Sequence, residues 1–385
     1  MSQSREPLRI VLSHSYCWPE VRRGGERYLH EVGSALARAG HSVRILSTAP
    51  VPGRTSVDGV PVTRLRTRSL ATSRFGAQAE EAAFGVQAGL WMALRKMDVW
   101  HALGVPDAAA ASVLGKITRT RSVFTALGLP LKWYWDLRPD RRLHDLVVRR
   151  VDSYICLSRA AAAALDEGWG RAGELVGGGV ALERFVPAPA RHDRPTLLYS
   201  GTFTEKRKNL QLLLEAVAIL RRKHGDLELW LSGQGDLSSL LAEAPTAARG
   251  AIVSIGVGGR EEQALRYGRA WVTVLPSHNE AFGLALLESL ACGTPIVALA
   301  GGGGPNDLVE PGVGVASGPS AAELAVACEA AIELAVRPET VDACRAVAAR
   351  YDWDRAIVPR LESIYRGHPA STTGTARQEA SAAPP

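Results

Sequence analysis

Short apolar segments alternate with amphipathic helical segments along this sequence, and the alternation begins again near its middle. The first apolar segment, LRIVLS (8–13), leads into a polar loop that ends at Gly24-Gly25, and a helical pattern follows until Gly40. SVRILST (42–48) then has the composition of a second strand. A strand, a helix and a strand in this order form a β-α-β unit, and such units build parallel sheets covered by helices.

The rest of the chain repeats this pattern. In the first half, further strands are predicted over 57–65 (with a hairpin as the alternative), 97–103, 122–128 and 153–158. In the second half, strands are predicted over 195–201, 227–233, 251–256 and 271–276, with a helix from about Leu210 to Lys223 that Asn209 can cap. Between the halves, FVPAPARHDRP (185–195) has the proline-rich, polar composition of a linker. Because 385 residues are many for one core, we expect an α/β protein with two doubly wound domains and a cleft between them.

The expected parts have these boundaries. The N-terminal domain covers 1–188 and the C-terminal domain covers 193–350. A last helix covers 353–366. The tail, 367–385, is rich in Ala, Thr, Ser and Pro, has little to bury, and is expected to be disordered.

Composition indicates a cytoplasmic globular protein. Hydrophobic residues make up 46% of the chain and charged residues 22%, which argues against wholesale disorder. The first residues, MSQSREPLRI, lack the basic and apolar regions of a signal peptide, and no apolar run of about 18 residues exists to span a membrane. The five scattered cysteines form no CxxC or Cys/His cluster, so we expect reduced core thiols and no structural zinc.

The net charge of +6 favours an anionic partner such as a phosphorylated ligand or a membrane surface. Arginines are spread evenly without a nucleic-acid-binding motif, so no nucleic-acid partner is expected. Only six of the 45 basic residues are lysine, a bias that, with abundant Ala and Gly, is typical of a GC-rich bacterial genome. A cluster of lysines is therefore more informative here than in an average protein.

SHNEAFGLALLESLACGTP (277–295) places two acids among apolar residues. Glu280 follows the strand WVTVLP, in the loop at its carboxyl end, where open α/β sheets bind ligands. A helix is expected to begin near Phe282 or Gly283, which puts Glu288 two turns into it. Both carboxylates can accept hydrogen bonds from sugar or ribose hydroxyls. The alternatives are that Glu280 only complements the helix dipole and that Glu288 is an exposed helical acid.

This stretch carries a longer signature. Its parts are Pro276-Ser277, Glu280, Phe282-Gly283, Glu288 and Cys292-Gly293-Thr294-Pro295. The signature resembles that of the retaining family-4 glycosyltransferases, the glycosyl transferases of group 1, which have the GT-B fold. The resemblance covers almost the whole chain apart from the tail and includes RGGERYLHEVGSALARAGHSVRILS, MDVWHAL, GGGVALERFVP, SGTFTEKRKNLQLLLEA and YDWDRAIVPRLESIY. It implies two Rossmann-like domains facing a cleft, with the last helix crossing back onto the N-terminal domain.

The resemblance also implies roles for individual residues. Glu288 should bind the nucleotide ribose, and Glu280 should lie near the hydroxyls of the transferred sugar. Lys208 should hold the donor phosphates, with Lys206 and Arg207 beside it. The remaining implied donor contacts are the amides of Phe282, Gly283 and Leu284 on the sugar, Gly24 and Gly25 at the diphosphate, and Val257 near the base.

Some positions depart from the family pattern. Thr202 stands where the family usually has arginine, and the segment to Lys208 is one residue longer, so Arg207 or Lys206 is expected to substitute. Leu127 stands where a histidine that contacts the donor sugar is common. That contact is absent or comes from His14 or His101, although structural roles are favoured for both. Gly178 and Ala181 replace the usual Asn and Asp.

The expected function is transfer of a sugar, with retention, from a nucleotide diphosphate sugar to a hydroxyl acceptor. The donor is a substrate, and neither a metal nor a cofactor is expected. The acceptor stays open between a lipid, a polysaccharide and a small cyclitol. A sugar-nucleotide epimerase or hydrolase of the same fold is one alternative, and a degenerate nucleotide-binding partner subunit is another.

Four further segments carry weaker signals. Asp352-Trp353-Asp354 resembles a metal-binding Asp-x-Asp but is better explained as a helix cap. GQGDLS (233–238) is an incomplete dinucleotide fingerprint after the wrong strand. Gly301 to Gly304 either borders the donor sugar or forms a flexible loop. Residues 131–150 mix aromatic and basic side chains and form either a platform for an acceptor or peripheral membrane contact, or an ordinary amphipathic helix.

Overall fold

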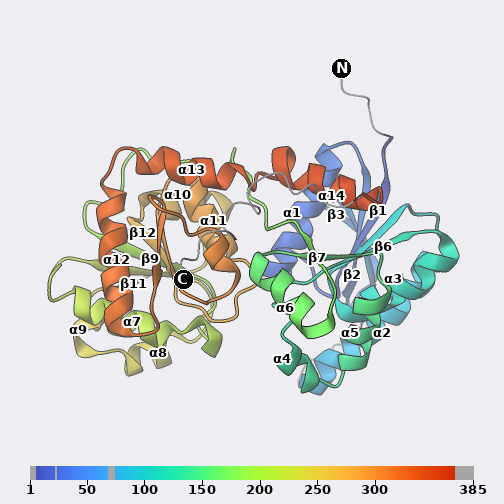
Figure 1. Cartoon of the computed structure of the whole chain (residues 1–385), viewed down its shortest axis with the longest axis horizontal. Coiled ribbons are helices and arrows are strands. Elements are labelled where there is room, and N and C mark those ends of the chain that lie inside the picture. The colour runs from blue at the N-terminus through green and yellow to red at the C-terminus, as the bar shows by residue number, and fades with distance from the viewer. Residues whose placement is uncertain (1–5, 22–23, 68–73, 369–385) are drawn as a thin grey trace, which may run out of the picture.

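The computed structural model describes residues 6–21, 24–67 and 74–368, which fold into two lobes side by side (Figure 1). The expected disorder of the tail falls on 369–385 and the signal-peptide argument on the first five residues, so both lie largely outside the described residues. Within the described ranges, every helix is too short or too polar to cross a bilayer.

The N-terminal lobe is built on an eight-stranded sheet in the order β3-β4-β2-β1-β5-β6-β7-β8. Its strands are β1 (Arg9–Ser13), β2 (Ser42–Ala49), β3 (Gly53–Val57), β4 (Val60–Arg66), β5 (Val99–Ala102), β6 (Arg121–Thr125), β7 (Ser153–Cys156) and β8 (Glu174–Leu175). Its helices are α1 (Gly24–Arg38), α2 (Arg74–Ala93), α3 (Val105–Thr118), α4 (Lys132–Asp136), α5 (Arg141–Arg150) and α6 (Arg159–Trp169). All pairings are parallel except β3 with β4, so the predicted segment 57–65 belongs to a hairpin.

The C-terminal lobe has a parallel six-stranded sheet in the order β11-β10-β9-β12-β13-β14. Its strands are β9 (Thr196–Ser200), β10 (Glu228–Ser232), β11 (Ile252–Ser254), β12 (Val272–Leu275), β13 (Ile296–Leu299) and β14 (Gly314–Ser317). Its α-helices are α7 (Leu210–Leu220), α8 (Leu237–Glu243), α9 (Thr246–Arg249), α10 (Arg260–Arg269), α11 (Leu284–Ala291), α12 (Ala321–Ala335) and α13 (Thr340–Ala349), and 3-10 turns lie at η1 (Lys206–Lys208) and η2 (Gly304–Asp307).

Each sheet reverses its winding direction once. In the first sheet the chain moves outward from β1 to β2 and then returns to β5 on the other side of β1. In the second sheet, β9 has β10 on one side and β12 on the other. Ligands of open α/β sheets bind outside the carboxyl ends of the strands at such a point. The fold therefore offers two ligand positions, one in each lobe, and the expectation of two doubly wound domains is confirmed.

The end of the described chain returns to the N-terminal lobe. Helices α13 and α14 (Val358–Tyr365) run along the top of the molecule from one lobe to the other in Figure 1. Between them a π-helical turn (Trp353–Ile357) is capped by Asp352, whose carboxylate accepts from the amides of Asp354 at 3.1 Å and Arg355 at 2.8 Å. The interpretation of this Asp-x-Asp as a cap is confirmed.

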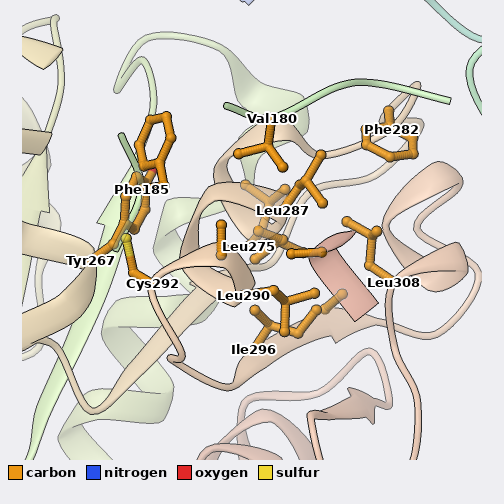
Figure 2. Close-up of a cluster of buried hydrophobic side chains, with 14 of the residues drawn as sticks. Val180, Phe185, Tyr267, Leu275, Phe282, Leu287, Leu290, Cys292, Ile296 and Leu308 are labelled. Atoms are coloured by element: carbon orange, nitrogen blue, oxygen red, sulfur yellow. The ribbon is translucent and has the colours of Figure 1, made fainter. Parts of the chain in front are cut away.

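Apolar packing joins residues 180–185, between the lobes, to α10 and α11. Figure 2 shows Val180 close to Leu287, and Phe185 beside Tyr267. The same packing explains a departure from the family pattern, because a β-carbon at Gly178 would lie 2.6 Å from the ring of Phe282. All five cysteines are free and buried, as predicted.

Candidate functional site

Glu280 forms ion pairs with two cationic side chains from the turn that follows a neighbouring strand. It lies in the loop after β12, and Lys208 and Arg207 lie in η1 after β9, so all three sit at the point where the second sheet reverses. One oxygen of Glu280, Oε2, accepts hydrogen bonds from Lys208 Nζ and Arg207 Nη1, both at 2.7 Å. Burial acts to raise the pKa of Glu280, but the charges of Lys208 and Arg207 outweigh it and lower that pKa below its ordinary value. The carboxylate is therefore ionised at neutral pH.

The loops after β9 and β12 are also tied together directly. The amide of His278 donates to the carbonyl oxygen of Arg207 at 2.8 Å, and the side-chain nitrogens of Asn209 and His278 are 3.3 Å apart. Asn209 has a left-handed backbone with φ 52° and makes no side-chain cap. Asn209 is the N-cap residue of α7, as predicted, but its side chain makes no capping hydrogen bond and lies against His278 instead.

The glycine-rich turn after β13 forms hydrogen bonds with the backbone of Glu280. Glu280 N donates to the carbonyl of Gly302 at 2.9 Å, and Gly304 N donates to the carbonyl of Glu280 at 2.8 Å. A β-carbon at Gly303 would lie 2.5 Å from that same Glu280 oxygen, so the close approach requires glycine. The turn over Gly302 to Gly304 is therefore packed on the Glu280 backbone, and contact with a donor sugar stays a prediction.

The helix after Glu280 begins at Leu284, slightly later than expected. Gly283 precedes it with φ 95°, a conformation that favours glycine, and Phe282 is buried against Tyr351 with ring centroids 5.3 Å apart. The first amides of a helix have no intrahelical acceptor and carry the positive end of its dipole. The predicted sugar-binding amides of residues 282–284 therefore lie at this helix start.

Glu288 in α11 is buried, with 3% of its surface exposed, and its carboxylate contacts the guanidinium of Arg27 in α1. The alternative of an exposed helical acid is therefore wrong. Arg27 also bonds Glu31 at 2.9 Å and lies 5.8 Å from the ring centroid of Phe185. Sequence reasoning missed Arg27, although it stands two positions after Gly25 in the RGGER segment.

Gly24 and Gly25 form the first residues of α1 rather than the end of a loop. Gly24 is exposed. A β-carbon at Gly25 would lie 2.9 Å from Cδ1 of Leu127, the residue that replaces the family's histidine. Gly25 thus leaves room for the side chain of Leu127, and close approach of a ligand to the two glycines stays a prediction.

Three further residues predicted to bind the donor make none of the contacts with Glu280 or Glu288 described above. Thr202 is linked to its own loop, with its hydroxyl 3.1 Å from that of Thr204. Lys206 is exposed in η1, next to Arg207. Val257, 47% exposed, follows the left-handed Gly256 beyond the end of β11. Of the two candidates for the missing guanidinium, the structure brings Arg207, rather than Lys206, to Glu280.

His101 has a structural role, as favoured from the sequence. It is fully buried, with Nδ1 2.7 Å from the hydroxyl of Tyr365 and Nε2 2.6 Å from that of Thr125. Burial lowers its pKa to about 3, so it stays neutral and joins α14 to the first sheet. His14 follows β1 and lines a cavity of the N-terminal lobe instead.

The aromatic segment 131–150 divides into α4 and α5. Trp133 is 59% exposed and Leu137 is 81% exposed, whereas Trp135 packs inward and stacks on the buried ring of His144 with centroids 4.0 Å apart. Burial lowers the pKa of His144 to about 4. Only part of this segment therefore presents a surface to a partner.

GQGDLS has a structural explanation. A β-carbon at Gly233 would lie 1.7 Å from the carbonyl oxygen of Gly201, so glycine lets the β9 and β10 loops pack together, and Asp236 caps α8. In the part of the chain that the structure describes, no group of three or more His, Cys, Asp or Glu side chains is arranged to hold a metal.

Comparisons with known proteins agree with this geometry. Residues 183–346 match the family described as Glycosyl transferases group 1, and residues 23–177 match the Glycosyl transferase 4-like domain. The chain is 26% identical to a phosphatidyl-myo-inositol mannosyltransferase of Propionibacterium freudenreichii, over 93% of this chain and 94% of that protein. It is 34% identical to a D-inositol 3-phosphate glycosyltransferase of Pseudarthrobacter chlorophenolicus, over 49% of this chain and 48% of that protein.

Solved structures share the GT-B fold. The sucrose-phosphate synthase of Thermosynechococcus elongatus matches with a TM-score of 0.79 at 23% identity, over 94% of this chain and 98% of that one. HepE of Anabaena, solved in complex with UDP and glucose, matches with a TM-score of 0.72 at 16% identity, over 92% of this chain and 100% of that one.

Proposed function

The chain belongs to the glycosyl transferases of group 1, and on this premise we propose that it transfers a sugar from a nucleotide diphosphate sugar to a hydroxyl acceptor with retention of configuration. The observation that carries the proposal is Glu280, kept ionised by Lys208 and Arg207 at the reversal point of the C-terminal sheet. The complex of HepE with UDP and glucose, although it concerns a distant relative, supports a nucleotide-linked donor.

The cations beside Glu280 have a role in the proposed reaction. The bond between the sugar and the diphosphate breaks with growing negative charge on the leaving phosphate, and fixed positive charges stabilise that charge. Lys208 and Arg207 supply such charges and need no metal to do so. Glu280 holds both side chains in place and orients the sugar hydroxyls, while Glu288 binds the ribose.

Retention is proposed to proceed by front-face substitution. The acceptor oxygen attacks the anomeric carbon on the side from which the phosphate leaves, and the acceptor proton passes to a leaving phosphate oxygen. Catalysis then consists of orientation and charge stabilisation, to which Glu280, Lys208 and Arg207 contribute. The acceptor is a lipid, a polysaccharide or a small cyclitol in this proposal, and the names of the relatives point to inositol compounds in those proteins.

We place the reaction in the cytoplasm. Exposed Trp133 and Leu137, with the arginines of α5, provide a route for peripheral contact with the inner membrane face. Co-sedimentation with anionic vesicles, lost in a Trp133→Ser and Leu137→Ser double variant, would support that contact, and equal sedimentation of the variant would exclude it.

A thermal-shift titration tests the proposed donor site. The protein is titrated with UDP, GDP, ADP and dTDP and with their common sugar conjugates, and one base is expected to raise Tm clearly. Consumption of that donor without an acceptor would favour an epimerase or hydrolase. Absence of any shift would favour a degenerate partner subunit, in line with Thr202 and Leu127. Glu280→Ala is expected to abolish transfer while nucleotide binding remains, and an active variant would remove Glu280 from the mechanism.

A further inference from the structure

A cavity of about 230 Å³ lies in the N-terminal lobe, outside the carboxyl ends of β1, β5 and β6. This is the reversal point of the first sheet and therefore the second position at which the fold favours a ligand. An engineered cavity of about 150 Å³ takes up benzene, so this one has room for a larger ring system. Of the residues considered for the donor, His14, an alternative to the family's histidine, lines it, whereas Glu280, Glu288 and Lys208 do not.

The wall of the cavity is mostly apolar. Aromatic, leucine and proline side chains from several separate elements form it, namely Phe84, Leu103, Pro106, Phe124, Leu129 and Trp135. Phe84 and Phe124 are buried in the hydrophobic core of the lobe, which holds the wall in place. A wall of this composition favours an apolar ligand with few polar groups.

The charged groups of the cavity are acids. Asp107 and Glu81 line it, and the structure places no lysine or arginine among the described residues of its wall. Asp107 is 1% exposed, and the hydroxyl of Ser13 donates to its carboxylate. Burial raises the pKa of Asp107 to about 7. A phosphate would therefore meet two acidic side chains, of which Asp107 keeps its proton up to about pH 7, and no lysine or arginine of the described wall.

The cavity borders the crevice between the lobes. Leu127, in its wall, lies against Gly25 at the start of α1. Leu129, also in its wall, lies 3.1 Å from the place of a β-carbon on Gly303, the glycine that packs on the Glu280 backbone. Two residues of the cavity wall therefore lie against the start of α1 and against the turn that packs on the Glu280 backbone.

We propose that this cavity binds the acceptor and that the acceptor is an uncharged molecule with an apolar ring system and a hydroxyl, rather than a phosphorylated cyclitol. The proposal rests on the proposed function and replaces the acceptor classes considered there with an apolar ring compound. It separates this chain from its relatives named for inositol phosphates and phosphatidylinositol, because the ligand predicted here carries no phosphate in the cavity.

Gly128 allows the cavity to be blocked with little effect on the fold. It lines the cavity, is exposed, and a β-carbon there would meet no atom within 4 Å. Gly128→Trp therefore adds an indole at the cavity mouth. Gly225 is a matched control, because it lies in an exposed turn of the other lobe and a β-carbon there also meets nothing within 4 Å.

The experiment measures binding of 2-naphthol and of myo-inositol 1-phosphate to the wild type, Gly128→Trp and Gly225→Trp by equilibrium dialysis. We expect saturable binding of 2-naphthol at one site, at least a ten-fold loss in Gly128→Trp and no change in Gly225→Trp, with no binding of the inositol phosphate. Binding of only the inositol phosphate, binding of neither probe, or equal 2-naphthol affinity in Gly128→Trp would overturn the proposal.

A parallel nucleotide titration keeps the two proposals separable. If a nucleotide raises Tm equally in all three proteins, the donor site is intact and the dialysis result concerns the cavity alone. If no nucleotide binds while 2-naphthol follows the expected pattern, the proposed transferase function fails and the cavity remains a site for an uncharged ring compound.

Discussion

The guanidinium of Arg27 in the N-terminal lobe pairs with the buried carboxylate of Glu288 in the C-terminal lobe. The acid proposed to bind the ribose therefore already has a protein partner across the crevice. A second pair, Arg159 with Asp307 at 3.2 Å, also links the lobes, but the side chain of Arg159 is 69% exposed. If a nucleotide binds Glu288 as proposed, it must compete with Arg27, and we then expect donor binding and the contact between the lobes to be coupled.

Arg27→Met is expected to destabilise the unliganded protein by about 3–5 kcal/mol, because it leaves a buried carboxylate without its cation. The same change is expected to enlarge the rise in Tm caused by the nucleotide, since ribose hydroxyls no longer compete with Arg27. Arg159→Met is the control and should alter neither quantity appreciably. A smaller nucleotide effect in Arg27→Met would show instead that Arg27 contacts the donor.

Lys208→Ala is expected to weaken nucleotide diphosphate binding about ten- to hundred-fold, because a hydrogen bond to a charged group contributes about 1.5–3 kcal/mol. Lys223 offers a control of equal charge in the same lobe, 65% exposed and paired with Glu329. Calorimetric titration of both alanine variants should show the loss only at Lys208. Equal affinities would remove Lys208 from the donor site.

The loss of the family arginine at Thr202 leads to a comparison of Arg207 and Lys206. Both residues are exposed in the same turn, but Arg207, 42% exposed, donates a hydrogen bond to Glu280. We therefore expect Arg207→Ala to lower kcat clearly and Lys206→Ala to leave kcat within about two-fold, since solvated surface charges contribute little. Steady-state kinetics with the identified donor make the comparison, and a larger effect at Lys206 would reverse the assignment.

Periodicity predicted the fold well because each strand and helix carries its own local signal. The apolar runs LRIVLS and LELWLSG became β1 and β10, and a restart after a proline-rich segment was enough to expect two sheets. Segment 57–65 stayed open between strand and hairpin, because the partner strand, β3, is exposed and lacks an apolar face. The positions of Glu280 and Glu288 followed from the order of strand, loop and helix.

Local sequence patterns could not predict the contacts between segments that lie far apart in the chain. The pairing of Arg27 with Glu288 depends on how the two lobes meet, and no periodicity near either residue indicates it. Gly178 departs from the family pattern because the ring of Phe282 leaves no room for a β-carbon there, a contact that exists only in the folded chain. Asn209 had the residue type of a cap, yet its left-handed backbone directs its side chain to His278 instead.

The glycine-rich turn under Glu280 provides a matched pair of substitutions. Gly301 and Gly303 have φ of 70° and 105°, so alanine is strained by about 1–3 kcal/mol at either. Only at Gly303 would the new β-carbon meet the Glu280 carbonyl, whereas at Gly301 it meets no atom within 4 Å. Gly303→Ala should therefore cost more stability in urea unfolding and should also lower transfer. Equal effects of the two variants would mean that backbone strain alone matters.

Asp107 is expected to make the stability of the N-terminal lobe depend on pH. Burial raises the pKa of this carboxyl from 3.8 to about 7, with the nearby Glu81 adding to the rise, while the hydroxyl of Ser13 and the amide of Gly104 oppose it. Between these values the unfolded chain has lost the proton that the folded chain keeps, so stability falls as pH rises, by at most about 1.4 kcal/mol per pH unit. Asp107→Asn retains a hydrogen-bonding side chain without a titrating group.

The difference in Tm between Asp107→Asn and wild type should therefore shift in favour of the variant from pH 4 to pH 7 and then level off. Using the difference cancels the titration of the other groups, and a difference that stays constant over this range would mean that Asp107 does not keep its proton in the folded protein.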